Sequence, residues 1–384
     1  MSFPPPEKKY MMKAIEAAAA GIGKTATNPL VGTCLVRDGE ILATSAHEKF
    51  GDLHAEAALF ARHPDKIEGS DLYCTLEPCI HPGKTPPCLP LILNSGLRRI
   101  IIAHEDPHPA VAGAGLRALR ASGFEVLYPL ARQEYRWLNR AYFYRLKTGL
   151  PWLELKLALS SDGYIATASH HSRWLSGPES RHHVHELRSR CDAVMVGAGT
   201  LREDNPGLTV RHKPCDNQPL AIIITTKSDE LPLECKLLTE RAAETVIVLP
   251  AATSASLVRK LRRRAVTVLL SDLKKGRFIW KQVLPRLAKL DIGRILIEGG
   301  GGLAGSLMSA GYLNEAHLFY CGRFLGDGIK SVRLEEKINK VGEGPHAGLV
   351  KTKVYGDDLY IQRLFQSPLK KNKFRLKSSP LFFA

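Results

Sequence analysis

No uninterrupted apolar run in this 384-residue sequence approaches the roughly 18 residues that a membrane helix needs. The N-terminal segment MSFPPPEKKY also lacks the apolar stretch of a signal peptide. We therefore expect a cytoplasmic protein with no membrane partner. A hydrophobic fraction of 44% and a charged fraction of 24% are ordinary for globular proteins, which argues against the disordered and fibrous classes.

Cysteine is scarce, with 8 residues scattered over the chain. That number is too small for a disulfide framework in a protein of this length. In a reducing compartment, cysteines that cluster are metal ligands or core residues. The cysteines therefore point to a metal site or to packing.

Acidic residues are outnumbered, since 54 Lys and Arg face 38 Asp and Glu and give a net charge of +16. Much of the excess lies in two runs, at 259–264 and 370–377. Neither run is interleaved with aromatic residues, as a groove for single-stranded nucleic acid would be. We favour a solvated surface and attraction of small phosphorylated ligands over nucleic-acid binding.

Helical and strand patterns alternate along the whole chain, which is typical of the α/β class. In the first half, Asp38-Gly39 between two apolar runs predicts a hairpin of strands 32–36 and 40–44. A helix predicted over 132–147 ends before Gly149-Leu150-Pro151, and a second alternating set with a mainly parallel sheet follows. We predict domains at 1–147 and 151–366 and a loosely ordered basic tail at 367–384.

The strongest chemical signal comprises His54-Ala55-Glu56, Pro78-Cys79 and Cys88. A His-x-Glu followed by Pro-Cys and a second Cys is the signature of zinc deaminases. One imidazole and two thiolates fill three tetrahedral positions and leave the fourth for water, whose pKa the metal lowers. Glu56, at the start of a helix, is then placed to carry a proton from water to a leaving amino group.

Eight residues separate Cys79 from Cys88, whereas the deaminase signature has two. The longer loop suggests extra groups for a small phosphorylated substrate. His81, within it, competes as a ligand, but its proline and glycine neighbours favour a loop or substrate role. Cys74, in a predicted strand, is expected in the core.

In the second half, a predicted strand ends at Glu298 and runs into four glycines and a helix start. Glycines let a backbone approach a phosphate, and a helix N-terminus offers unpaired N–H groups. A flexible turn is the alternative explanation for the glycine run alone.

Several segments of the first half resemble the bifunctional riboflavin biosynthesis deaminase/reductases: 28–32, 54–56, 75–79, 83–88 and 106–109. The resemblance continues through 156–166, 172–177, 196–200 and 204–211, and covers about 11–365. Lys84 stands where the family usually has Arg, His108 where it has Asn, and Thr27 where it has Pro. The resemblance implies a cytidine-deaminase-like three-layer α/β/α domain and a dihydrofolate-reductase-like α/β domain.

The resemblance also implies the residues of both sites. In the deaminase, these are the zinc ligands His54, Cys79 and Cys88, the catalytic Glu56, and Asn28 for the pyrimidine. In the reductase, NADPH would contact Ala158, Trp174, Thr200, Asp204, Gly300, Gly301, Gly302, Leu303, Ala304, Gly305 and Ser306. The substrate would contact Ser172, Arg188, Leu208, Arg211 and Glu298. Arginine forks suit phosphate oxygens, and Asp162 and Glu298 are candidates for proton handling.

The implied reactions are hydrolytic deamination of a diamino-ribosylamino-pyrimidinone phosphate and NADPH-dependent reduction of its ribosyl group to ribityl. One zinc per deaminase domain and a homodimer are also implied. Two rival hypotheses are a tRNA or nucleotide deaminase with an accessory domain, and a non-catalytic second half that has kept only the fold.

Overall fold

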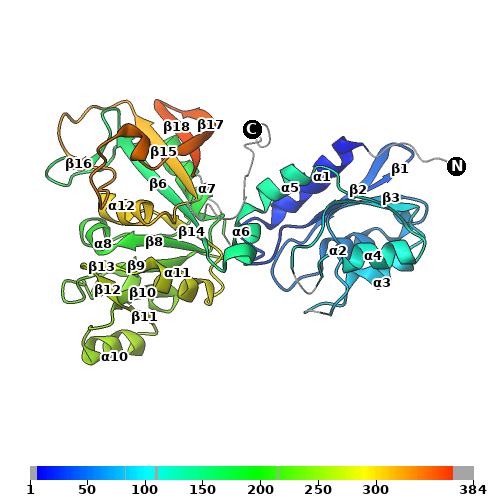
Figure 1. Ribbon diagram of the computed structural model, residues 1–384, viewed down its shortest axis with the longest axis horizontal. Coiled ribbons are helices and arrows are strands. Elements are labelled where there is room, and N and C mark those ends of the chain that lie inside the picture. The colour runs from blue at the N-terminus through cyan, green and yellow to red at the C-terminus, as the bar shows by residue number, and fades with distance from the viewer. Residues whose placement is uncertain (1–6, 83, 109–110, 213, 216, 366–384) are drawn as a thin grey trace. The chain divides into compact units, whose positions relative to one another are not determined.

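The computed structural model describes residues 7–82, 84–108, 111–212, 214–215 and 217–365. They form two compact units, the first ending at Thr148 and the second beginning at Gly149 (Figure 1). The predicted tail, 367–384, lies outside the described residues. Within these residues, no helix is both long and apolar enough to cross a membrane.

The first unit is a five-stranded sheet with helices on both faces. Its strands, β1 Gly32–Arg37, β2 Glu40–Ala46, β3 Asp71–Leu76, β4 Arg99–His104 and β5 Glu125–Leu127, lie in the order β2-β1-β3-β4-β5. Its helices are α1 Lys8–Ala18, η1 Ala19–Gly21, α2 Ala55–Arg62, η2 Pro64–Lys66, α3 Cys88–Leu93, α4 Ala114–Ala121, α5 Arg132–Leu138 and α6 Arg140–Thr148.

Figure 1 shows α1 and α5 over one face of this sheet and α2, α3 and α4 over the other. The hairpin between β1 and β2 forms as predicted, with φ of 52° at Asp38 and 84° at Gly39. Strands β3, β4 and β5 are parallel, so their carboxyl ends meet at one edge of the sheet. That edge carries the segments that follow Leu76 and His104.

The single helix predicted over 132–147 is wrong in one respect. The structure ends α5 at Leu138 and begins α6 at Arg140, with Asn139 between them at φ −96° and ψ 22°. Helical periodicity continues across the break, which is why the sequence alone does not reveal it.

The second unit is built on a nine-stranded sheet in the order β11-β10-β9-β8-β14-β6-β15-β18-β17. These strands are β6 Trp152–Ser160, β8 Ala193–Gly197, β9 Leu220–Ile224, β10 Thr245–Pro250, β11 Thr267–Ser271, β14 Arg294–Ile297, β15 Glu315–Cys321, β17 Ala347–Tyr355 and β18 Asp358–Phe365. Short strands are β7 Tyr164–Ala166, β12 Leu273–Lys274, β13 Arg277–Phe278 and β16 Ile329–Lys330. The helices are α7 Pro178–Arg188, α8 Ala198–Asp204, α9 Lys236–Thr239, η3 Ala242–Glu244, α10 Ala255–Arg263, α11 Trp280–Ala288, α12 Gly301–Ser309 and η4 Val341–Glu343.

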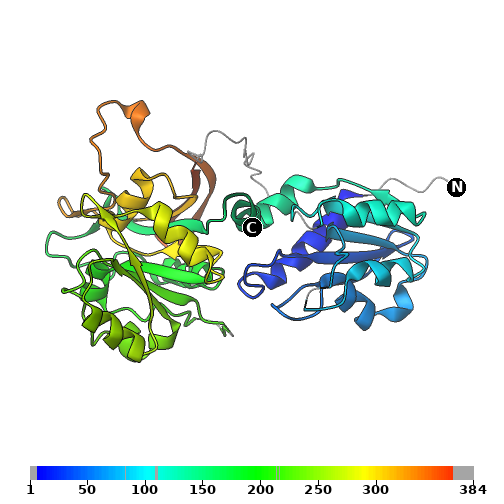
Figure 2. The same cartoon turned by 60° about the horizontal axis from the view of Figure 1, so that its bottom comes forward.

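Seven neighbouring strands of this sheet are parallel, as predicted, because helices cross between them: β11, β10, β9, β8, β14, β6 and β15. The antiparallel pair β18 and β17, which the sequence analysis did not predict, extends the sheet beyond β15. Two apolar cores fill the faces: α11 and α12 pack on one, and α7, α9 and α10 on the other. Figure 2 shows α12 and α10 on opposite sides of the sheet.

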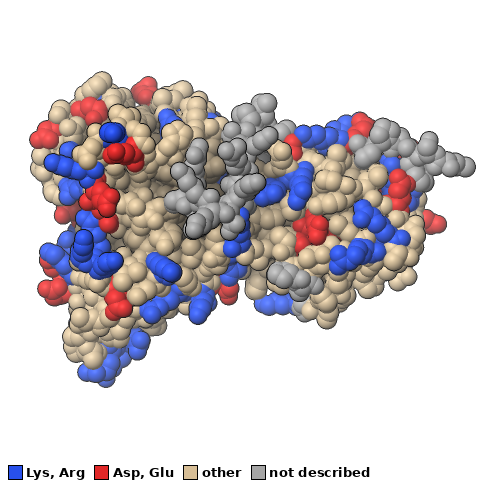
Figure 3. Space-filling view, viewed as in Figure 1, with Lys and Arg blue, Asp and Glu red and all other residues tan. Residues whose placement is uncertain are grey.

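The basic run at 259–264 forms the outer face of α10. Val258 and Leu261 of this helix are buried, while its Lys and Arg side chains gather at the lower edge of the second unit in Figure 3. Arg264 forms an ion pair with Glu234 at 2.9 Å. This arrangement is that of a solvated helix face.

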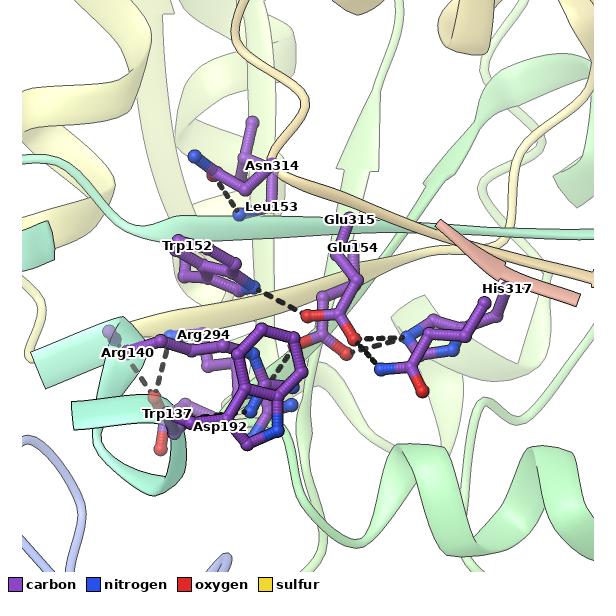
Figure 4. Close-up of polar contacts among 12 residues, drawn as sticks. Trp137, Arg140, Trp152, Leu153, Glu154, Asp192, Arg294, Asn314, Glu315 and His317 are labelled. Atoms are coloured by element: carbon purple, nitrogen blue, oxygen red, sulfur yellow. Dashed lines mark hydrogen bonds and ion pairs between the residues drawn. The ribbon is translucent and has the colours of Figure 1, made fainter. Parts of the chain in front are cut away.

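A buried polar network joins four neighbouring strands of the second unit (Figure 4). The carboxylate of Glu154 pairs with Arg294 and lies 3.1 Å from Nε2 of His317. Glu315 accepts hydrogen bonds from the Trp152 indole at 3.2 Å and from the Gln362 amide. Since protein donors already occupy both carboxylates, the network is a structural clamp rather than a cation site.

Replacing Arg294 by Met is expected to lower the free energy of unfolding of the second unit by about 3–5 kcal/mol, because Glu154 would keep its buried charge without this cation. Urea denaturation measures the loss. Arg277→Met is the matched control, since its pair with Glu335 at 2.6 Å is partly exposed and contributes about 1 kcal/mol or less. Equal losses in the two variants would contradict the assignment.

Candidate active sites

In the first unit, the structure brings the three predicted zinc ligands together. His54 is the residue before α2, Cys79 follows β3, and Cys88 begins α3. The Nδ1 atom of His54 lies 3.4 Å from Sγ of Cys79 and 3.5 Å from Sγ of Cys88. His81 is exposed in the intervening loop and is not part of this cluster.

The spacing of these atoms fits a tetrahedral zinc ion. Zn–S bonds of about 2.3 Å and Zn–N bonds of about 2.0–2.1 Å place sulfur and nitrogen about 3.5–3.6 Å apart at a tetrahedral angle. The two S···N distances, 3.4 and 3.5 Å, lie close to that value. The donor set of one imidazole and two thiols also suits zinc.

Electrostatics prepares the cluster for a cation. The hydrogen bond with Cys88 lowers the pKa of the Cys79 thiol to about 4, and the same contact raises the pKa of Cys88. The hydrogen bond to Cys79 in turn raises the pKa of His54. Cys79 is therefore the more readily deprotonated of the two thiols.

Glu56 lies in the first turn of α2, two residues beyond His54, and only 4% of its surface is exposed. Burial raises the pKa of its carboxyl group. Its carboxylate is not one of the clustered ligand atoms, so it borders the cluster without joining it. The thiol of Cys74, which is buried as predicted, lies against Glu56.

His47 lies beside the cluster, and the sequence analysis did not single it out. Its ring lies edge-on to that of His54 at 5.7 Å, and its Nδ1 is 3.0 Å from the carbonyl oxygen of Leu53. Its Nε2 is buried without a hydrogen-bond partner among the described residues, which suits it to accept from a ligand N–H. Only the spacing of two histidines before a helix could have suggested it.

Asn28 lies half-buried in the segment that leads into β1. Val31, three residues on, accepts a hydrogen bond from the backbone N–H of His47 at 3.0 Å. This link places the Asn28 segment beside the His54 cluster.

In the second unit, the carboxyl ends of the parallel strands β6, β8 and β14 open into a cavity of about 800 Å³. Ligands commonly bind at this edge of parallel sheets. The predicted residues that line it are Ala158, Ser172, Trp174, Arg188, Thr200, Asp204, Leu208, Arg211, Glu298, Gly300, Gly301, Gly302 and Leu303.

Three residues predicted to contact NADPH do not line this cavity. Ala304 is fully buried in the core, and Ser306 accepts a hydrogen bond from the Trp280 indole at 3.0 Å. A Cβ atom at Gly305 would lie 1.9 Å from the carbonyl oxygen of Arg333. All three therefore face the interior of the unit, because α12 turns them away from its open end.

The glycine run combines two roles. Gly300 and Gly302 have open space around them, as expected for a backbone that a ligand approaches. A Cβ atom at Gly301 would lie 2.3 Å from the carbonyl oxygen of Lys330. Gly301 and Gly305 are thus required for close packing of α12 on the segment at 330–333.

Arg188 does not present an open fork to a phosphate. Its Nε and Nη2 donate to the two carboxylate oxygens of Glu298, at 2.5 and 2.9 Å, and its Nη1 donates to the carbonyl of Thr209 at 2.9 Å. This cation lowers the pKa of Glu298 against the opposing effect of burial. Arg211, by contrast, is exposed at the cavity rim.

Lys156, on β6, also lines the cavity beside this pair. Burial lowers the pKa of its ammonium group, and the carboxylate of Glu298 opposes that shift. Asp162, a candidate for proton handling, instead accepts backbone hydrogen bonds from Leu325 and Gly326 and does not line the cavity. Its carboxylate anchors a loop.

His185 of α7 lines the cavity and is 5% exposed. Burial, followed by the positive charge of Arg188, lowers its pKa to about 4. Its Nδ1 accepts the backbone N–H of Arg211 at 3.3 Å, which requires the unprotonated nitrogen.

The pH dependence of the stability of the second unit should therefore include a contribution from His185. In the unfolded chain a histidine binds its proton near pH ~6.5, so between about pH 6.5 and 4 the unfolded state holds a proton that the folded state lacks. The free energy of unfolding should fall as pH drops through this window, by up to ~1.4 kcal/mol per pH unit for this residue. Urea titrations of His185→Gln should show a shallower pH slope, whereas His346→Gln, at an exposed position, should keep the wild-type slope. An unchanged slope in His185→Gln would count against a neutral His185.

Comparisons with known proteins agree with this division of the chain. A family model described as the cytidine and deoxycytidylate deaminase zinc-binding region matches residues 5–104, and the RibD C-terminal domain matches residues 151–361. The riboflavin biosynthesis protein RibD of Bacillus amyloliquefaciens is 36% identical over 92% of this chain and 95% of its own length. The RibD of Aquifex aeolicus is 35% identical over 92% and 97%.

Solved structures give the same result. Acinetobacter baumannii RibD matches with a TM-score of 0.84 at 28% identity, covering 94% of this chain and 98% of its own. A diaminohydroxyphosphoribosylaminopyrimidine deaminase/5-amino-6-(5-phosphoribosylamino)uracil reductase from Thermotoga maritima matches with a TM-score of 0.80 at 30% identity, covering 94% and 98%. The predicted cytidine-deaminase-like and dihydrofolate-reductase-like fold classes are confirmed.

Proposed function

Because this chain belongs to the RibD family of riboflavin biosynthesis proteins, we propose that the His54 cluster and the cavity of the second unit carry its two consecutive reactions. The chain is a bifunctional deaminase and reductase. It removes the 2-amino group of 2,5-diamino-6-ribosylamino-pyrimidinone 5′-phosphate as ammonia, then reduces the ribosyl group to give 5-amino-6-ribitylaminouracil 5′-phosphate. Family matches to both halves favour this function over the two rival hypotheses.

The gathering of one imidazole and two thiols beside a buried carboxylate is the observation on which the deaminase proposal rests. His54, Cys79 and Cys88 would hold one zinc ion per deaminase unit. When bound, zinc supplies an acidified water close to neutral pH. Glu56 would take a proton from that water and deliver it to the departing amino nitrogen, which leaves as ammonia.

A raised pKa suits Glu56 to this task, because its carboxyl group holds a proton more readily than that of an ordinary glutamate. Asn28 would hold the pyrimidine through its side-chain amide. The buried acceptor of His47 would orient the ring from the His54 side.

In the second unit, NADPH would supply hydride to C1′ of the ring-opened sugar. The residues proposed to contact it are Ala158, Trp174, Thr200, Asp204, Gly300, Gly301, Gly302 and Leu303. Ser172, Leu208 and Arg211 would bind the substrate, with the exposed guanidinium of Arg211 on the phosphate. Arg188 would act indirectly, by fixing Glu298 in its ionised form.

Lys156 is the proposed proton donor of the reduction. Its side chain lines the cavity next to Glu298, and burial lowers its pKa, so its proton is released more readily than that of an ordinary lysine. Addition of hydride to C1′ leaves negative charge on the adjoining substrate nitrogen, which takes the proton from this ammonium.

We also propose a homodimer formed through the second unit and a cytoplasmic location, as the sequence resemblance implies. Sedimentation of the full chain tests the dimer. For the two activities, metal analysis with ammonia release, followed by NADPH consumption on the deaminated product, is the direct test. Zinc-loaded, folded protein that releases no ammonia would overturn the deaminase proposal. Folded protein that consumes no NADPH with the deaminated product would overturn the reductase proposal.

A further inference from the structure

Asn139, at the break between α5 and α6, forms side-chain hydrogen bonds with a distant segment of the first unit. Asn139 is 3% exposed, and it faces the segment before β1, 109 residues away in the sequence. Its Oδ1 accepts the backbone N–H of Leu30 at 2.7 Å, and its Nδ2 donates to the carbonyl oxygen of Leu30 at 3.0 Å. One amide side chain thus satisfies both polar groups of one residue.

Leu30 lies between Asn28 and the part of the segment that contacts the His54 cluster through His47. Asn28 lies two residues before it, and Val31 after it is bonded to His47, whose ring contacts that of His54. Pro29, between them, has no N–H to offer as an anchor. Asn28 itself is held by a local turn, in which its N–H donates to the carbonyl of Thr25 at 3.0 Å and its carbonyl accepts from the Thr25 hydroxyl at 3.3 Å.

The chemistry of this contact requires a carboxamide. Leu30 presents one donor and one acceptor, and only Asn or Gln offers the complementary pair on one planar group. Aspartate has the same shape but would place an oxygen against the Leu30 carbonyl, so it would break one hydrogen bond and add repulsion. The neighbouring helices keep their backbone ladder, since Asn139 N–H donates to Tyr135 and its carbonyl accepts from Phe143, both at 3.0 Å.

We propose that Asn139 is a positioning residue of the deaminase, which fixes Leu30 and thereby holds Asn28 at its working distance from the His54 cluster. This inference rests on the proposed function, in which Asn28 holds the pyrimidine. It differs from a merely structural role, because the loss must appear in substrate handling and must pass through Asn28.

The test uses the full zinc-loaded chain with Asn139→Asp. We expect kcat/KM for ammonia release to fall by about 10–100-fold, as misplacement of a reacting group by about 1 Å does. Zinc content should stay at the wild-type level, and NADPH consumption with the deaminated substrate, an internal control in the same chain, should be unchanged. Asn139→Gln, which keeps both amide groups, should lose less and serves if the aspartate variant does not fold.

Asp71→Asn is the matched control for a buried polar loss in the same unit. Asp71 is 2% exposed and pairs with Arg98 and Arg99 at 2.7 and 2.8 Å, at the end of β3 remote from Cys79. This variant should be less stable than wild type but keep its kcat/KM for ammonia release. If Asp71→Asn lowers kcat/KM as much as Asn139→Asp does, the positioning role is overturned.

A double-mutant cycle with Asn28→Ala decides whether the effect passes through Asn28. Once Asn28 is removed, adding Asn139→Asp should lower kcat/KM less than about 3-fold further, since coupled residues are not additive. Full additivity, or an Asn139→Asp variant with wild-type kcat/KM, would overturn the inference. A wild-type chain that holds zinc but releases no ammonia would instead overturn the proposed function.

Discussion

Replacing Glu56 by Ala is expected to leave zinc in place and to lower ammonia release by about 10²–10⁴-fold. The carboxylate lies outside the ligand cluster, so its removal should not cost the metal. Its carboxyl group is buried beside the cluster, and this burial raises its pKa, as suits a group that must hold a proton between two transfers.

Metal analysis and an ammonia assay on the same sample measure both quantities. Glu48→Ala is the control, because Glu48 lies in the same unit and pairs with Arg62 at 2.9 Å on the surface. It should retain both zinc and rate. Near wild-type ammonia release from Glu56→Ala would remove this residue from the mechanism, and loss of zinc in that variant would make it a ligand instead.

Replacing Lys156 by Met is expected to lower NADPH consumption by about 10²–10⁴-fold while ammonia release continues at the wild-type rate. Methionine fills a similar volume but cannot donate a proton. Since a donor must be protonated, the wild-type reductase rate should also fall as pH rises through the lowered pKa of Lys156. In the methionine variant this alkaline limb should disappear.

Stopped-flow absorbance of NADPH over a pH series measures the effect, with the deaminated pyrimidine as substrate. Lys227→Met is the control, because this lysine pairs with Glu230 on the surface and does not line the cavity. A Lys156→Met enzyme with the wild-type rate and pH profile would exclude Lys156 as the donor.

Features that depend on short sequence motifs were predictable from the sequence. The order of His54, Cys79 and Cys88 indicated a zinc cluster, and the structure gathers those atoms. The hairpin at Asp38-Gly39 and the parallel core of the second sheet were predictable for the same reason, since turn residues and apolar runs are local signals.

Contacts between distant residues were not predictable. The partner of Asn139 lies 109 residues away, and Arg188 meets Glu298 across 110 residues. The sequence alone does not show whether an arginine is free to bind a phosphate or is already paired with a carboxylate, as Arg188 is. Similarly, the last two strands at one end of the sheet, β18 and β17, are only partly buried, so their alternation of apolar and polar residues is weak.

The contrast between Gly301 and Gly302 bears on how this stretch tolerates genetic change. A methyl group at 302 would project into empty space, whereas one at 301 or 305 would meet a backbone carbonyl oxygen of the facing segment at 330–333. A substitution at 302 costs little more than backbone freedom, whereas one at 301 or 305 would push α12 away from the segment at 330–333 and deform this side of the cavity. Neighbouring glycines of one run thus meet two different requirements, open space at Gly302 and close packing at Gly301.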